Sequence, residues 1–171
     1  MSAVPGSGIG VTMQAIEVHQ LADLVGQFLS LLRDSGPVLR TGRDGDPLTR
    51  LTPAVYPQDP EASAEFAAAT RDDLLDRRAD DARIVRDALD SVLGDDTAIP
   101  AELTIPEAHI DAWLRTLAAL RLVIASRLGI EDGPAPDPGD PRLGVYEWLG
   151  YRLELLVESA DARDDDARTA D

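Results

Sequence analysis

The chain has 171 residues and a formal net charge of −16, with 32 acidic residues against 16 basic ones. Every basic residue is an arginine, and the sequence has no lysine, asparagine or cysteine. This composition excludes disulfides, zinc–thiolate sites, thiol nucleophiles and catalytic or phosphate-binding lysines. The negative charge opposes direct binding to nucleic acid and to anionic membranes. With 44% hydrophobic residues, a chain of this length is expected to form one domain around its own core.

The N-terminal part predicts a flexible arm, a short extended segment and one helix. Residues 1–8 lack the basic and apolar stretches of a secretory signal, so we expect an arm there and a cytoplasmic protein. Apolar residues alternate with small or polar ones over residues 9–13, which indicates a short strand or an extended arm. They recur at three- and four-residue spacing over residues 21–32, which predicts an amphipathic helix that ends before Gly36 and Pro37.

The middle of the chain predicts a long loop and one interrupted helix. Residues 34–59 are rich in Gly, Pro and Asp, and we expect a loop with one helical turn over residues 48–51. The next helix begins at Pro60, a residue favoured in a first helical turn. A second capping pattern at Thr70 predicts a break or kink there. The apolar stripe continues beyond it and stops at Gly94.

The clearest helical pattern follows. Thr104 and Glu107 have the spacing of a capping box, which predicts that a helix begins at this point. Apolar residues cover most of the circumference of the following segment as far as Leu128, and Gly129 is a typical C-terminal cap. A helix that is apolar on most sides is usually the central one of a domain.

The C-terminal part predicts a loop, a last helix and a tail. Residues 131–141 are proline-rich, and an amphipathic pattern runs from Leu143 to Val157. Residues 161–171 are rich in Asp and have no apolar side chain larger than Ala, so we expect a disordered acidic tail. The chain is thus expected to form an all-α domain over residues 9–160, a compact bundle of about five helices with at most two very short strands.

No pattern in the sequence predicts a catalytic, cofactor-binding or metal-binding residue. His19 and His109 each lie two residues after a Glu, a spacing that points two side chains of a helix in different directions. No nucleophile-elbow motif is present. Alternating Asp and Arg over residues 71–86 are typical of an ion-paired helix face in contact with solvent.

Arg121 is the most informative charged residue. It lies on or near the apolar face of the central helix, where a guanidinium needs a carboxylate partner. We expect an ion pair with Glu147, Glu154 or Glu158 on the last helix. The candidates for structural contacts or partner binding are Trp113, Arg121, Arg127, Tyr146 and Trp148.

Four segments in order carry a family resemblance. They are residues 17–25, residues 56–74, residues 113–130 with Leu120-Arg121-Leu122, and residues 145–149. Together they resemble DUF2017, an actinobacterial family of unknown function. Because some members are described as transcription regulators in oxidative stress, the resemblance implies such a role. It also implies a link to the Clp protease, because the adaptor of this protease is encoded beside many members. Those regulators sense through cysteines, which this chain lacks.

These observations predict a non-enzymatic regulatory protein that acts by protein–protein contact in stress-linked transcription. We expect the partner to belong to the transcription machinery or to the Clp system. We expect no direct contact of the protein with nucleic acid or membrane. The sequence is also compatible with a homodimer. The alternatives are an accessory factor of the Clp protease and adaptor, and a carboxylate-dependent hydrolase. Several carboxylates converging in a deep pocket would favour the hydrolase.

Overall fold

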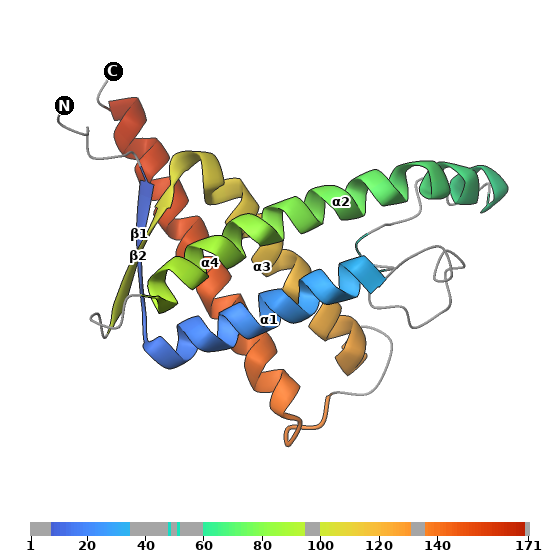
Figure 1. Ribbon diagram of the computed structural model, residues 1–171, viewed down its shortest axis with the longest axis horizontal. Coiled ribbons are helices and arrows are strands. Elements are labelled where there is room, and N and C mark those ends of the chain that lie inside the picture. Colours follow the sequence, from blue (N-terminus) through green and yellow to red (C-terminus); the bar gives the residue numbers. More distant parts are fainter. Residues whose placement is uncertain are drawn as a thin grey trace.

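The computed structural model describes residues 8–34, 48, 51, 60–94, 100–130 and 136–169. These residues form four long helices and two short strands (Figure 1). In chain order the elements are β1 (Gly8–Met13), α1 (Ala15–Asp34), α2 (Pro60–Leu93), β2 (Ala101–Pro106), α3 (Glu107–Leu128) and α4 (Pro141–Thr169). The predominantly helical fold is confirmed, with four helices in the described residues instead of about five.

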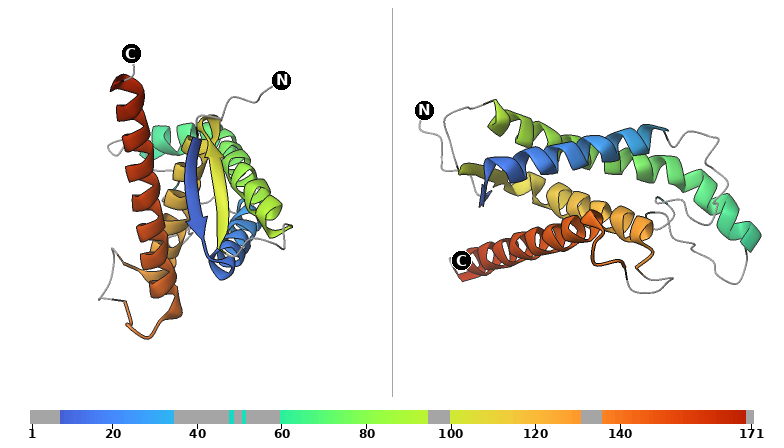
Figure 2. Two further views of the ribbon diagram at one scale, coloured as in Figure 1. Left: turned by 90° about the vertical axis from the view of Figure 1, so that its left-hand side faces the viewer. Right: turned by 90° about the horizontal axis from the view of Figure 1, so that it is seen from below.

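The helices form two antiparallel pairs whose axes cross, and the expected compact bundle is not confirmed. α1 lies beside α2, and α3 lies beside α4 (Figure 1). Seen from below, α3 lies between the α1–α2 pair and α4 (Figure 2). Its buried residues cover several sides of the helix, among them Ile110, Leu117 and Val123. The prediction that α3 is the central helix is therefore confirmed.

The two strands pair antiparallel, from Gly8 opposite Pro106 to Met13 opposite Ala101. The buried side chains of β2 alternate strictly with exposed ones, as expected for a strand with one face on a core. This sheet confirms the expected strand near residues 9–13, although β1 already begins at Gly8. Residues 1–7 of the expected arm lie outside the described part.

The beginning of α3 differs from the predicted capping box. Thr104 lies in β2, opposite Gly10, and the residue at the N-cap of α3 is Pro106, which has no capping side chain. Pairing with β1 therefore extends the strand up to the first helical residue. The predicted end is correct, because Gly129 adopts the left-handed conformation (φ 64°) and its N–H donates to the carbonyl of Ser126.

The helix α2 is continuous through the predicted break at Thr70. The hydroxyl of Thr70 donates a hydrogen bond to the carbonyl of Phe66, 2.8 Å away, one turn earlier. The side chain therefore bonds back within the helix instead of capping a new one. The expected start at Pro60 is confirmed.

Leu48 and Leu51 agree with the helical turn that the sequence predicts over residues 48–51. The N–H of Leu51 donates to the carbonyl of Leu48 at 3.0 Å, as in the expected helical turn, and both side chains are fully buried in the core. Asp34, the first residue of the expected loop, is still part of α1, and the remaining loop residues lie outside the described part.

The end of α4 corrects the prediction of a disordered acidic tail. Residues 161–169 continue the helix, and Arg163 forms an ion pair with Glu107 at the start of α3, with 2.6 Å between nitrogen and oxygen. Arg168 pairs with Asp165 one turn earlier. Arginine and alanine are good helix formers, and arginines within the acidic run offset its self-repulsion. Residues 170 and 171 lie outside the described part.

Candidate functional site

The most extensive polar contact between distant segments joins the start of α1 to α4. The indole N–H of Trp148 donates to Glu17 Oε1 at 2.9 Å, and the guanidinium of Arg152 forms an ion pair with the same carboxylate oxygen. The backbone N–H of Gln14 donates to Glu17 Oε2 at 2.8 Å, which is half of a capping box at the first turn of α1. Glu17 therefore caps its own helix and holds α4 in place.

Burial raises the pKa of Glu17, but other contacts outweigh it. Hydrogen bonds from Arg152, Trp148 and the N–H of Gln14, together with the positive charge of Arg152, bring the pKa from its ordinary value of 4.5 to about 2. The carboxylate is thus ionised at any physiological pH. Only 21% of the Glu17 side chain and 13% of the Arg152 side chain are exposed, so this is a mostly buried pair.

Arg152 also contacts the sheet. One of its guanidinium nitrogens donates to the backbone carbonyl of Thr12 in β1 at 3.2 Å. The cluster of Glu17, Trp148 and Arg152 thus joins β1, α1 and α4, and it has the chemistry of a structural clamp. It is not arranged for proton transfer, because its carboxylate is ionised and already accepts several hydrogen bonds.

Arg121 contacts the last helix through an aromatic ring instead of the predicted carboxylate. Its guanidinium carbon lies 4.4 Å from the centroid of the Tyr146 ring, a cation–π contact between α3 and α4. Gly150 makes this approach possible, because a Cβ at that position would lie 3.1 Å from the guanidinium carbon. Within the described residues Arg121 forms no ion pair, so the expected partner among the glutamates of α4 is not found.

The reason is geometric. Leu149 is the most deeply buried residue of α4, and the predicted partners Glu147, Glu154 and Glu158 lie on the opposite side of the helix. Tyr146 and Gly150 lie on the flank of α4 that meets α3, so Arg121 reaches them first.

An open groove follows this flank and the outer side of α4, with a volume of about 760 Å³. We call it the α4 groove. Its lining residues are Arg121, Tyr146, Glu147, Gly150, Tyr151, Leu153, Glu154, Val157 and Glu158. Tyr151 is 58% exposed and Val157 is 41% exposed. Within the described part of the chain its three glutamates form no ion pair and no side-chain hydrogen bond, so the groove combines exposed apolar surface with unpaired negative charge.

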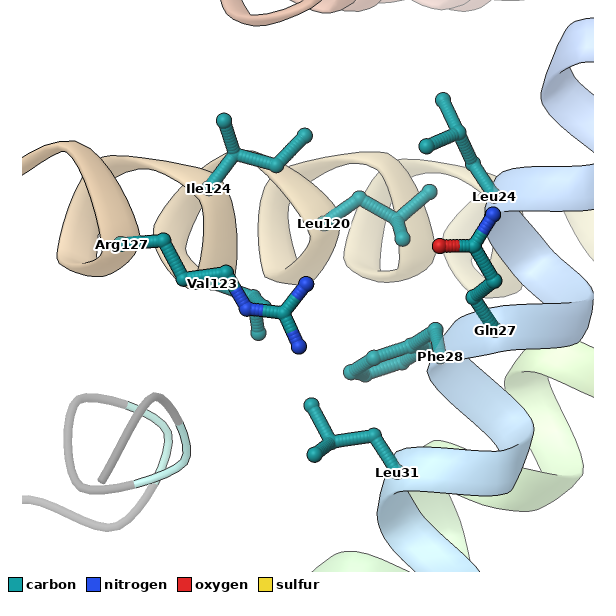
Figure 3. Close-up of a pocket in the computed structure, with 8 residues that line it drawn as sticks. All are labelled: Leu24, Gln27, Phe28, Leu31, Leu120, Val123, Ile124 and Arg127. Atoms are coloured by element: carbon teal, nitrogen blue, oxygen red, sulfur yellow. The ribbon is translucent and has the colours of Figure 1, made fainter. Parts of the chain in front are cut away.

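The other predicted candidates lie in different places. Trp113 is 2% exposed and belongs to the core. Arg127, near the end of α3, extends past Val123 towards Phe28 and Leu31 of α1, where a cavity of about 30 Å³ opens (Figure 3). That volume holds about one water molecule and is too small for a cofactor. The structure thus brings Arg121 and Tyr146 together and keeps Trp113, Arg127 and Trp148 apart from them.

The charged face of α2 is ion-paired at several of its positions, in part as the sequence predicted. Arg83 contacts Asp80 and Arg86 contacts Asp90 within the helix, and Arg115 of α3 binds Asp81 of α2 with 2.8 Å between nitrogen and oxygen. The described residues contain no group of three or more His, Asp or Glu that could hold a metal ion. None of the helices in the described ranges is long and apolar enough to cross a membrane.

Sequence reasoning missed Glu17, Arg152 and Tyr151. A signal existed for the first two: a partly buried tryptophan N–H needs an acceptor, and Arg152 lies one helical turn after Trp148. The acceptor is 131 residues away in sequence, however, and no local pattern identifies it. Tyr151 lies outside the apolar stripe of α4, where an exposed aromatic residue has no periodic signal.

The comparison with protein families agrees with the resemblance seen in the sequence. The family described as "Domain of unknown function (DUF2017)" matches residues 1–160, and the chain belongs to this family. No curated protein and no solved structure matches the chain.

Proposed function

We propose that this DUF2017 protein is a non-enzymatic, cytoplasmic regulatory protein that acts by binding a basic partner protein through the α4 groove. The observation that carries the proposal is the unpaired charge of that groove. Several acidic side chains on α2 have arginine partners close by, as Asp80 and Asp90 do, whereas Glu147, Glu154 and Glu158 have none within the described residues and lie beside exposed apolar side chains. Carboxylates placed beside exposed apolar surface are well suited to a partner that brings the opposite charge.

The shape of the groove supports binding of a protein rather than a small molecule. Its exposed side chains, Tyr151 and Val157, lie on the surface of one helix, and the groove is open along the outer side of that helix. Exposed aromatic residues are enriched at protein interfaces, where they contribute contact area with little loss of conformational entropy. The net charge of −16 adds long-range attraction towards a basic partner.

We infer that this partner belongs to the transcription machinery and is a subunit of RNA polymerase or a sigma factor. Such proteins expose basic surfaces that bind nucleic acid, and an acidic protein fits them by charge. The regulator role attributed to some relatives directs the search in the same way.

The proposal is tested with purified RNA polymerase and sigma factor from the same organism. We expect binding to the full chain that weakens as salt is raised and that does not change when nuclease is added. Removing three charges in the variant Glu147→Gln/Glu154→Gln/Glu158→Gln is expected to weaken binding by about tenfold or more.

The matched control removes three charges from exposed positions on α2, in the variant Asp73→Asn/Asp76→Asn/Asp87→Asn. It should bind nearly as tightly as the wild-type protein. An equal loss in both variants would assign the binding to net charge alone and contradict a role for the groove. Binding to the Clp adaptor instead of either transcription protein would contradict the proposed partner and favour the alternative.

A further inference from the structure

The outer side of α4 repeats one arrangement of side chains. Glu147, Tyr151, Glu154 and Glu158 are separated by four, three and four residues, so they form one stripe along the helix. We call it the outer stripe. Tyr151 has one carboxylate a turn before it and another a turn after it. The stripe faces away from α3, because Leu149 on the opposite side of the helix is fully buried.

The two arginines closest to the outer stripe do not neutralise its carboxylates. The guanidinium of Arg121 is stacked on Tyr146, 4.4 Å from the ring centroid, and packs against Gly150. Arg152 lies 6.0 Å from the centroid of the Tyr151 ring, and its charge is engaged by Glu17. Tyr151 nevertheless stays 58% exposed. The stripe therefore offers an accessible aromatic ring between carboxylates that no described arginine neutralises.

We propose that the outer stripe is a binding site for an arginine side chain of the partner, whose guanidinium stacks on Tyr151 and donates hydrogen bonds to Glu147 or Glu154. The inference rests on the proposed function and names the chemical group that the groove recognises. The same kind of contact already occurs inside the protein, between Arg121 and Tyr146.

Arginine fits this site better than lysine for a geometric reason. A guanidinium is planar, so it can lie flat on the ring while the N–H groups at its edge donate to a carboxylate. An ammonium is a compact, strongly hydrated charge and cannot do both equally well. Val157 lies about 9 Å further along the helix axis and is 41% exposed, which suits an aliphatic side chain of the same partner segment.

The test uses two fluorescently labelled peptides of equal length and charge. Both alternate leucine with basic residues; one carries arginine at every basic position and the other carries lysine. Their affinities for the full chain are measured by fluorescence anisotropy at low salt. We expect the arginine peptide to bind about threefold to fivefold more tightly, the range of a cation–π contact at an exposed site.

Variants of Tyr151 decide whether that ring causes the preference. Tyr151→Leu keeps an apolar side chain and should bring the ratio of the two affinities close to one, with the lysine peptide little affected. Tyr151→Phe should keep the preference, because the ring remains. The control Phe66→Leu removes an exposed aromatic ring from α2 and should also keep it.

The outcomes separate this inference from the proposed function. Equal affinity for the two peptides, no binding of either, or a preference that survives Tyr151→Leu overturns the arginine site. If the arginine site is overturned in this way, the proposed function can still be supported. It is supported if RNA polymerase or sigma factor binds the wild-type protein and the triple glutamate variant weakens that binding. A preference that disappears with Tyr151→Leu supports the arginine site even if neither transcription protein binds.

Discussion

A single carboxylate, Glu17, connects three elements of this fold, and its removal should be costly. In Glu17→Gln the guanidinium of Arg152 stays mostly buried without its counter-charge. We expect the free energy of unfolding at neutral pH to fall by about 3 kcal/mol, the size implied by the lowered pKa and typical of a broken buried pair. Chemical denaturation measures the change. Glu154→Gln, at an exposed position, is the control and should stay within about 0.5 kcal/mol of the wild-type protein.

The same residue predicts how stability depends on pH. The pKa of Glu17 in the folded protein is about 2, below its ordinary value of 4.5, so the ionised carboxylate stabilises the fold above pH 4.5. This contribution is lost as the pH falls towards 2. The difference in unfolding free energy between the wild-type protein and Glu17→Gln should therefore be constant near neutral pH and shrink below pH 4.5. A difference that stays constant down to pH 2 would show that Glu17 is not ionised by these contacts.

At the residue scale, the sequence singled out several residues that make contacts between segments, but it did not identify their partners. Arg121, Tyr146 and Trp148 all make specific contacts between segments, as their chemistry suggested. The partners were not predictable, because helical spacing gives the direction of a side chain around its own helix only. Which side of α4 faces Arg121 depends on how the two helices are rotated against each other.

At the scale of elements, two glycines inside α4 allow a matched comparison. Both Gly144→Ala and Gly150→Ala should favour the helix, by up to about 1 kcal/mol. A Cβ at Gly144 meets no atom within 4 Å, whereas one at Gly150 lies 3.1 Å from the guanidinium carbon of Arg121. We expect Gly144→Ala to raise the melting temperature and Gly150→Ala to raise it less or lower it. An equal increase in both variants would show that Arg121 does not pack against Gly150 in solution.

Element types were well predicted and some element ends were not. Periodic apolar residues and prolines placed the helices correctly, because both act within a few residues of the chain. Thr104 has the pattern of a helix cap and lies in a strand, since the pairing with residues 8–13 competes with the cap. Residues 161–169 have the composition of a disordered tail and continue α4, where Arg163 contacts Glu107 of another helix. Local patterns carry no information about such distant partners.

At the scale of the whole molecule, net charge gives the most general prediction. With a charge of −16, the protein should not bind duplex DNA with sub-micromolar affinity at moderate salt. It lacks the excess of basic side chains that would neutralise phosphates and release their counterions. Fluorescence anisotropy with a labelled duplex measures this. Tight binding that weakens with salt would contradict both this prediction and a partner bound through negative charge.

The sequence by itself determined the helical class, the central position of α3, the family and the chemistries that are excluded. These depend on composition and on periodicity along the chain, which are local quantities. Only the tertiary structure decided the clamp at Glu17, the stacking of Arg121 on Tyr146 and the α4 groove. Each of these depends on which faces of distant segments meet, and that is settled by the packing of the whole core rather than by any one segment.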